Sequence, residues 1–275
     1  YYCLYGNSPG FYENTEPLAG AVTEIKQELR ALGDKRPIIY VGATTDAYQP
    51  KEKLRRVTRE LLEFLTAERF PVTILTKSPL ILRDIDLLQQ INKDGKLLVQ
   101  FTILTVSERK SRILERGTPA PSVRLETASQ LENVGIPVHF HVSPFIPDLY
   151  SEGELEEITK EIKSHGGTCI YTNTLGMRHS CREPFLQALR KIDEGIEQRI
   201  LRSYPNIEDN KNGVYSPYSE YIVEQMLRFR RVCEQEGVSF VCETIPQFTI
   251  FDKQEFESGI FRFGQPAVYQ MMTFW

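Results

Sequence analysis

Cysteine and histidine are the residues of this chain that could bind a metal. No two of the five cysteines form a C-x-x-C pair, which favours small buried side chains for most of them: Cys3, Cys169, Cys181, Cys233 and Cys242. His139 and His141 alternate, so both point to one face of the strand expected at 138–142. A metal pair there would need a further ligand, and the nearby sequence offers no carboxylate or third histidine.

Polar residues lie where the first three expected strands end: Gly42, Thr44 and Asp46; Thr76 and Lys77; and Thr102. The carboxyl ends of parallel strands converge on one face, so we expect these side chains to lie near one another. Each also has a structural interpretation. Asp46 could cap the next helix, and Lys77 could be a solvated charge at the rim.

The elements that would position these residues alternate along the chain. Short apolar runs predict strands, and stretches with helical spacing of apolar residues predict the helices between them. The strands are expected at 37–41, 72–75, 97–104, 138–142 and 168–171, and the helices at 17–32, 51–68, 80–91, 122–134 and 152–164. This order predicts an α/β fold, a partial or full (β/α) barrel with parallel strands.

From Cys181 onward the pattern changes. Two long helices, at 182–201 and 219–236, are followed by a short strand at 238–242 and by a tail rich in aromatic residues at 248–275. We expect a barrel core at 1–180 and a C-terminal extension at 181–275 that completes or caps it.

The composition narrows the classes of function. A net charge of −4 gives no global attraction to nucleic acid, although a local basic groove would be compatible with it. No apolar run approaches the ~18 residues of a membrane span, and no signal peptide is evident, so we expect a cytoplasmic protein with reduced cysteines.

Four stretches carry a resemblance to a known family, and together they cover residues 1 to about 150: Tyr2 to Gly6; Val41 to Glu52; Pro71 to Ser78, which runs into Leu82-Arg83-Asp84; and Leu114-Glu115 through Arg124 to Pro147. In this order they resemble the radical S-adenosylmethionine (SAM) enzymes, most closely the spore photoproduct lyase-like branch, also called DNA repair photolyase. The first stretch is similar to the end of a C-x-x-x-C-x-Tyr-Cys motif, whose first two cysteines would precede Tyr1. The chain departs from the family at Glu115-Arg116-Gly117, where Glu-Pro-Arg is usual.

The resemblance implies a radical SAM barrel with a [4Fe–4S] cluster and SAM. Cys3 would be a cluster ligand, and the residues implied to contact SAM are Tyr2, Gly42, Thr44, Asp46, Thr76, Lys77, Thr102, Arg124, Ser143 and Ile146. Among these, Thr44 or Asp46 would accept from the amino group, and Arg124 would fork onto a carboxylate unless it forms a surface salt bridge. Ser143 and Ile146 would flank adenine, with structural packing as the alternative. Cys169 is our candidate for a thiol that returns hydrogen to a product radical.

The implied activity is radical initiation by hydrogen abstraction, with a flavodoxin or ferredoxin as external electron donor. The substrate is unidentified. A nucleic-acid lesion follows from the family, and a peptide or small molecule is the alternative. A basic, aromatic-lined groove at the barrel mouth would favour DNA, and an acidic mouth would argue against it. A cluster-free barrel that serves as a binding protein is the second class of function.

Overall fold

The protein is an α/β structure in which one parallel sheet carries helices on its outer side. The computed structural model describes residues 20–43, 45–204, 214–215, 220–242 and 270–272. Its main strands are β1 (Ile39–Val41), β2 (Val72–Thr76), β3 (Leu97–Thr102), β4 (Val138–His141), β5 (Cys169–Thr172), β8 (Ser239–Cys242) and β9 (Gln270–Met272). A separate antiparallel pair is formed by β6 (Met177–Arg178) and β7 (Val214–Tyr215).

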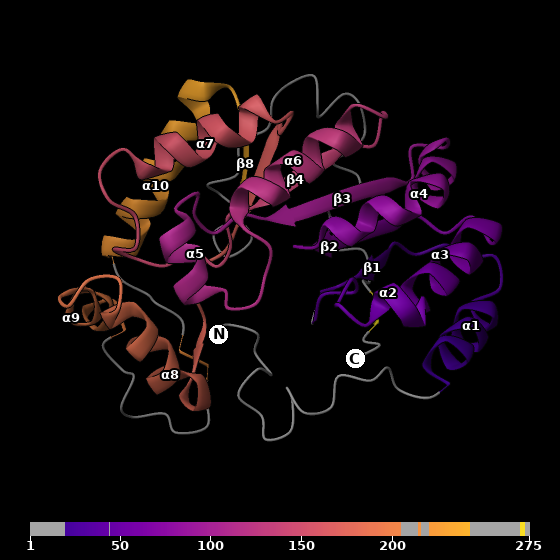
Figure 1. Cartoon of the computed structure of the whole chain (residues 1–275), viewed down its shortest axis with the longest axis horizontal. Coiled ribbons are helices and arrows are strands. Elements are labelled where there is room, and N and C mark those ends of the chain that lie inside the picture. The colour runs from indigo at the N-terminus through magenta and orange to yellow at the C-terminus, as the bar shows by residue number, and fades with distance from the viewer. Residues whose placement is uncertain (1–19, 44, 205–213, 216–219, 243–269, 273–275) are drawn as a thin grey trace.

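Helices lie at the positions that the sequence predicts, and α5 (Glu108–Leu114) is a further helix that it did not predict. The helices are α1 (Ala21–Ala31), α2 (Glu52–Arg55), α3 (Val57–Ala67), the 3-10 helix η1 (Pro79–Asp84), α4 (Ile85–Asn92), α5, α6 (Pro121–Glu132), α7 (Glu154–Ser164), α8 (His179–Arg190), α9 (Ile196–Arg202) and α10 (Glu220–Glu236). Figure 1 shows α3, α4, α6, α7 and α10 arranged along the outside of the row of strands.

The sheet has the order β8-β5-β4-β3-β2-β1-β9, and all neighbouring strands in it are parallel. This confirms the predicted α/β fold with parallel strands. The row of described strands is open, with β8 and β9 at its edges, and the choice between the partial and the full form of the barrel stays a prediction. Because β8 lies beyond residue 180 and pairs with β5, the C-terminal region contributes to the sheet. The proposed boundary between 180 and 181 stays a prediction.

Three expected helices are interrupted, one of them at 80–91, where the 3-10 helix η1 is followed by α4. The helix predicted at 51–68 is split at Arg56, whose φ of 54° lies in the left-handed region. The helix predicted at 182–201 is split between α8 and α9. Apolar spacing alone does not show such breaks: it predicts that Leu54 faces inward on one helix at 51–68, whereas Leu54 lies on α2 and is 87% exposed. The aromatic tail, apart from the backbone of β9, and its predicted capping role lie outside the described residues.

The two faces of the sheet differ in chemistry. The face toward the helices is apolar, with Val72, Ile74, Val99, Phe101 and Phe140 in the main hydrophobic cluster. The register places the other side chains on the opposite, inner face, including the partly exposed Tyr40 and the buried residues Thr73, Gln100, Thr102, His139, His141 and Tyr171. A strictly structural barrel interior is filled by branched aliphatic residues. The inner face is therefore where the fold departs from simple core packing.

A second hydrophobic cluster lies at the carboxyl side of the sheet. It joins α5, α8 and α9 to the loops that follow β3, β4 and β5, through residues that include Leu104, Leu114, Ile146, Leu175 and Leu189. The Tyr204 hydroxyl donates to the Leu175 carbonyl at 2.7 Å, which fastens the end of α9 to this cluster. Across the described residues, no helix combines the length and apolar character that a membrane crossing needs.

Candidate functional site

The loop after β1 is fastened to the end of β2 by Asp46. Its Oδ1 accepts from Thr76 Oγ1 at 2.7 Å and from the Tyr48 amide at 2.9 Å, and its Oδ2 accepts from the Lys77 amide at 2.8 Å. The sequence correctly predicts that Asp46, Thr76 and Lys77 lie close together. Both carboxylate oxygens of Asp46 are engaged, however, so the residue sets the position of Lys77 and has reduced capacity for a ligand.

The close approach of the end of β1 to the end of β2 requires a glycine at position 42. Its φ is +90°, and a Cβ built there would lie 2.2 Å from the Leu75 carbonyl oxygen. No other residue type fits without a backbone shift. A structural reason therefore accounts for this glycine, and its predicted contact with SAM stays a prediction.

Arg124 is fully buried and pairs with a carboxylate of the protein itself. Its Nη1 donates to Glu115 Oε2 and to the Thr102 carbonyl, both at 2.9 Å. Its Nε donates to the Pro119 carbonyl at 2.8 Å, and its Nη2 donates to Thr118 Oγ1 at 2.6 Å. The alternative of a surface salt bridge is wrong, because the pair lies inside the protein, where it holds the segment after α5 against the end of β3.

The other carboxylate oxygen of Glu115 accepts no hydrogen bond. Glu115 Oε1 is buried and has no hydrogen-bond partner, and Lys77 Nζ lies 3.9 Å from it. The Glu115 side chain is 1% exposed, whereas that of Lys77 is 28% exposed and reaches solvent. A carboxylate oxygen and an ammonium, both with spare hydrogen-bonding capacity, thus lie beside one another at the carboxyl ends of β2 and β3. We refer to Lys77, Glu115 and Arg124 as the open network.

Sequence reasoning missed the importance of Glu115. It noted the residue only within the stretch that carries the resemblance. The available signal was an acidic residue directly after the apolar pair Ile113-Leu114, in a segment that must return to the sheet. Which partner it would find could not be read from spacing, because Arg124 and Lys77 approach it from different elements.

The inner face adds a stack of three rings next to the open network. Tyr171 of β5 stacks on His141 of β4 with ring centroids 5.2 Å apart and an interplanar angle of 5°, and on His139 with centroids 5.7 Å apart. Burial lowers the pKa of both histidines to about 3, and the charges of His139 and Lys77 contribute for His141. Both rings are therefore neutral at pH 7, and His141 Nε2 has no hydrogen-bond partner.

Three predicted site residues have mainly structural surroundings. Ser143 Oγ donates to Asn173 Oδ1 at 2.6 Å, and Ile146 is fully buried in the second hydrophobic cluster. Cys169 is the first residue of β5 and is also fully buried. It lies at the amino end of its strand, so the structure does not bring it to the strand ends where Lys77 lies. The predicted role of Cys169 in hydrogen return has no support from this position.

Tyr2, Cys3 and Thr44 lie outside the described residues. Within the part of the chain that is described, no three or more His, Cys, Asp or Glu side chains are grouped so that they could hold a metal ion. The predicted cluster ligand Cys3 therefore stays a prediction.

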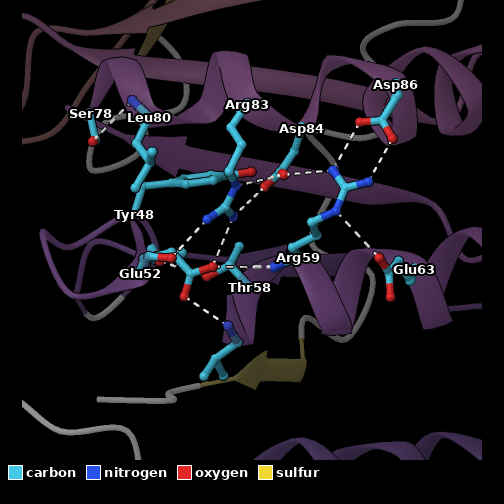
Figure 2. A network of polar contacts seen from close by, with 12 residues as sticks. Tyr48, Glu52, Thr58, Arg59, Glu63, Ser78, Leu80, Arg83, Asp84 and Asp86 are labelled. Carbon is cyan, nitrogen blue, oxygen red and sulfur yellow. Dashed lines mark hydrogen bonds and ion pairs between the residues drawn. The ribbon is translucent and has the colours of Figure 1, made fainter. Parts of the chain in front are cut away.

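A second ionic network lies between α2 and α3 on one side and η1 and α4 on the other, and sequence reasoning did not anticipate it (Figure 2). Arg83 forks onto Asp84, with Nε to Oδ1 at 2.9 Å and Nη2 to Oδ2 at 2.7 Å, and its Nη2 also donates to Glu52 Oε1 at 2.9 Å. Arg59 Nη1 donates to Asp84 Oδ1 at 2.9 Å. Glu52 and Asp84 are fully buried. We refer to Glu52, Arg59, Arg83 and Asp84 as the closed network.

The closed network has a buried tyrosine beside it. Burial raises the pKa of Tyr48 well above its usual value, and the neighbouring charge of Asp84 adds to the effect. Tyr48, Glu52, Arg83 and Asp84 all come from the stretches that carry the family resemblance. Packing and charge pairing within the protein account for the presence of these residues in those stretches, without a bound ligand.

An open pocket of about 550 Å³ lies between the start of α5 and the start of α7. Its charged lining residues are Lys110, Glu152, Glu154 and Glu157. Lys110 is already engaged, since its Nζ bonds to Glu154 Oε2 at 2.5 Å and to the Leu149 carbonyl at 2.6 Å. The remaining character of this pocket is acidic.

Comparison with known proteins gives relatives and structural neighbours. No protein-family model matches the chain. The uncharacterized protein MJ0683 of Methanocaldococcus jannaschii is 32% identical over 193 residues, which are 69% of this chain and 68% of that protein. The uncharacterized protein Rv2578c of Mycobacterium tuberculosis is 28% identical over 207 residues. That alignment covers 75% of this chain, and the chain spans only 58% of the length of the mycobacterial relative.

Among solved structures, a mutant of spore photoproduct lyase matches with a TM-score of 0.54 and 18% identity, covering 80% of this chain and 66% of that one. Spore photoproduct lyase complexed with dinucleoside spore photoproduct matches with a TM-score of 0.52 and 18% identity, covering 80% and 64%. At this identity the likeness shows a shared fold.

Proposed function

The chain belongs to the same family as MJ0683 and has the radical SAM fold of spore photoproduct lyase, and from this premise we propose that it binds SAM and a [4Fe–4S] cluster as a radical SAM enzyme. When bound, these groups would supply a 5′-deoxyadenosyl radical that abstracts hydrogen from the substrate. The chain's own residues would bind and orient SAM and exclude water from the reacting atoms.

The observation that carries the proposal is the pair of opposite charges at the open network. The methionyl end of SAM is a zwitterion, with an ammonium and a carboxylate on one carbon. Glu115 Oε1 offers a buried acceptor for the ammonium, and Lys77 Nζ, 3.9 Å away, offers a donor for the carboxylate. A ligand without a hydrogen-bond donor at this point would leave Glu115 Oε1 as an unsatisfied buried acceptor, although the carboxylate charge stays paired with Arg124.

This proposal reassigns one role and keeps others. The sequence gave the role of ammonium acceptor to Thr44 or Asp46, and we assign it to Glu115, because the oxygens of Asp46 are occupied by Thr76, Tyr48 and Lys77 and Thr44 lies outside the described residues. Arg124 becomes a positioning residue, since it is fully buried and its guanidinium already donates to Glu115 and to the Thr102 carbonyl at the end of β3. Thr102, at the end of β3, stays a candidate for the ribose hydroxyls.

The cluster would be held outside the described residues. Cys3 is its proposed ligand, and the resemblance places two further cysteines before Tyr1. One electron from an external flavodoxin or ferredoxin would be needed for each radical formed.

Two substrate classes fit the proposed reaction. The shared fold favours a nucleic-acid lesion. The acidic pocket beside α5 and α7 instead favours a peptide or a cationic small molecule, because glutamate side chains repel phosphate groups. DNA binding at low salt separates the two classes, and the assay should include a Glu152→Gln/Glu157→Gln variant. Tighter DNA binding by this variant would show that the pocket faces the nucleic acid.

Anaerobic reconstitution of the full-length protein with iron and sulfide, followed by EPR of the reduced sample, tests the proposed class. A [4Fe–4S]⁺ signal that shifts on addition of SAM is expected. Glu115→Gln should keep the signal and need a higher SAM concentration for the shift. Folded full-length protein that takes up no iron would overturn the proposal in favour of a binding protein.

A further inference from the structure

The short helix α2 displays an apolar side chain at the protein surface. Leu54 is 87% exposed, far more than Val123 at 43% or Val134 at 41%. The side chains of Lys53, Arg55 and Arg56 are exposed around it. A single exposed leucine needs no explanation by itself. The features that set this one apart are its ring of cations and the rigidity of the backbone that carries it.

The closed network ties α2 to η1 (Figure 2). Glu52, the first residue of α2, is fully buried, and its Oε2 accepts from the Val57 amide at 2.9 Å, so it caps the start of α3. Arg83 Nη1 donates to the Glu52 carbonyl oxygen at 2.7 Å, and Arg83 Nη2 donates to Glu52 Oε1 at 2.9 Å. Two adjacent helices are thus tied to one partly buried arginine, Arg83, with the left-handed Arg56 between them. Leu54 projects from a fixed backbone.

The location of α2 relates it to the proposed chemistry. The loop from β1 to α2 leaves the carboxyl edge of the sheet, where Asp46 ties it to Thr76 and Lys77. Lys51 follows Asp46 by five positions, which span at most about 18 Å of extended chain. The exposed surface of α2 therefore lies at the same edge of the sheet as the open network.

We propose that Leu54, with Lys53 and Arg56 beside it, is the docking surface for the protein that delivers the electron, an acidic one-electron carrier of the flavodoxin or ferredoxin class. The inference rests on the proposed function. In the step it serves, the reduced carrier loses one electron and the [4Fe–4S]²⁺ cluster gains it. An apolar contact within a cationic rim suits an acidic protein partner, because the charges steer the encounter while the leucine supplies desolvated contact area. A DNA-binding surface would need more cations, since about six to ten phosphate contacts are typical of such proteins.

A matched pair of double variants tests the proposal in the full-length, cluster-loaded protein. Lys53→Glu/Leu54→Ala changes the docking surface and spares both ionic networks. Lys93→Glu/Val134→Ala makes the same kinds of change at exposed positions that precede β3 and β4, at the amino edge of the sheet. The affinity for reduced flavodoxin is measured by titration calorimetry at low and high salt. The rate of cluster reduction is measured with flavodoxin and, separately, with dithionite.

We expect the first variant to weaken flavodoxin binding about tenfold or more and to reduce the flavodoxin-driven rate in proportion, with the dithionite rate unchanged. The second variant should match the wild type in all three measurements. Unchanged flavodoxin affinity, or an equal loss of the dithionite rate, would overturn the docking proposal. Single-stranded DNA binding by both variants is measured by fluorescence anisotropy, and its loss in the first variant with carrier binding intact would overturn the proposal in favour of a nucleic-acid surface. Failure of the proposed function is recognised separately, because the wild type would then take up no iron.

Discussion

The closed and open networks are two buried ionic clusters that differ in one respect. In the closed network every carboxylate oxygen accepts at least one N–H donor, including two from Arg83 to Asp84. In the open network Glu115 Oε2 accepts from Arg124, and Glu115 Oε1 has no hydrogen bond. Both clusters remove charges from water, which costs free energy unless the charges are paired. A fully paired cluster can only hold structure, whereas an incompletely paired one retains capacity for a ligand.

The largest expected effect comes from breaking the closed network. Arg83→Met would leave the fully buried Glu52 and Asp84 without their main partner, so we expect a loss of about 3–5 kcal/mol in the free energy of unfolding. Urea denaturation measures it. Lys26→Met is the matched control, because its pair with Glu60 is solvated, and removal should cost less than about 1 kcal/mol. Equal losses in the two variants would mean that the closed network is not a structural support.

The second prediction concerns SAM affinity, which should depend on the open network and not on the closed one. Glu115→Gln keeps an oxygen for Arg124 but removes the charge, and we expect SAM binding to lose about 1.5–3 kcal/mol, or roughly 10- to 150-fold in affinity. Glu52→Gln, the same change in the closed network, should lower the free energy of unfolding and leave the SAM affinity of the folded protein unchanged. Titration calorimetry with SAM on both variants measures this. A similar loss of affinity in both would remove the distinction.

The sequence predicted the fold better than it predicted these networks. Strand and helix order depends on local spacing of apolar residues, and all five expected parallel strands before residue 180 are present. The convergence of Asp46, Thr76 and Lys77 followed from a general property of parallel strands. The pairing of Arg83 with Glu52 joins residues 31 positions apart in sequence. Such pairings depend on the tertiary positions of helices, which no local pattern encodes.

Burial was the other quantity that local patterns could not supply. Arg124 lies on α6 among residues whose types allow a surface position, yet it is fully buried. His139 and His141 were correctly placed on one face of their strand, but their stacking on Tyr171 and their neutral state depend on β5 and on the residues that cover the inner face.

Acid should affect the region of the open network selectively, because both buried histidines lie there and the closed network has none. The pKa of His141 is about 3 when folded, against 6.5 for the ordinary residue. Between these values the unfolded chain binds more protons, so stability falls as the pH falls below 6.5, by about 2 kcal/mol at pH 5 for one histidine. We expect His141→Gln to give a flatter dependence of unfolding free energy on pH from 6.5 to 5. An unchanged slope would mean that His141 is hydrated in solution.

The smallest effect, and the most specific, is expected from Lys77→Met. Lys77 is partly exposed and 3.9 Å from Glu115, so its loss should change the free energy of unfolding by less than about 1 kcal/mol. SAM affinity should fall about tenfold, because the ligand carboxylate loses its cation. The charge of Lys77 also lowers the pKa of His141, so the variant should raise that pKa and lessen the acid sensitivity just described.

NMR titration of the His141 ring and calorimetry with SAM report the two consequences of Lys77→Met independently. A rise in the His141 pKa with unchanged SAM affinity would retain Lys77 as a neighbour of the ring stack but remove it from the ligand site. The zwitterion pairing would then lose its carboxylate half, and the open network would be reduced to a cation-accepting Glu115. The converse result, weaker SAM binding with no change at His141, would place the lysine toward the mouth of the barrel and away from the inner face.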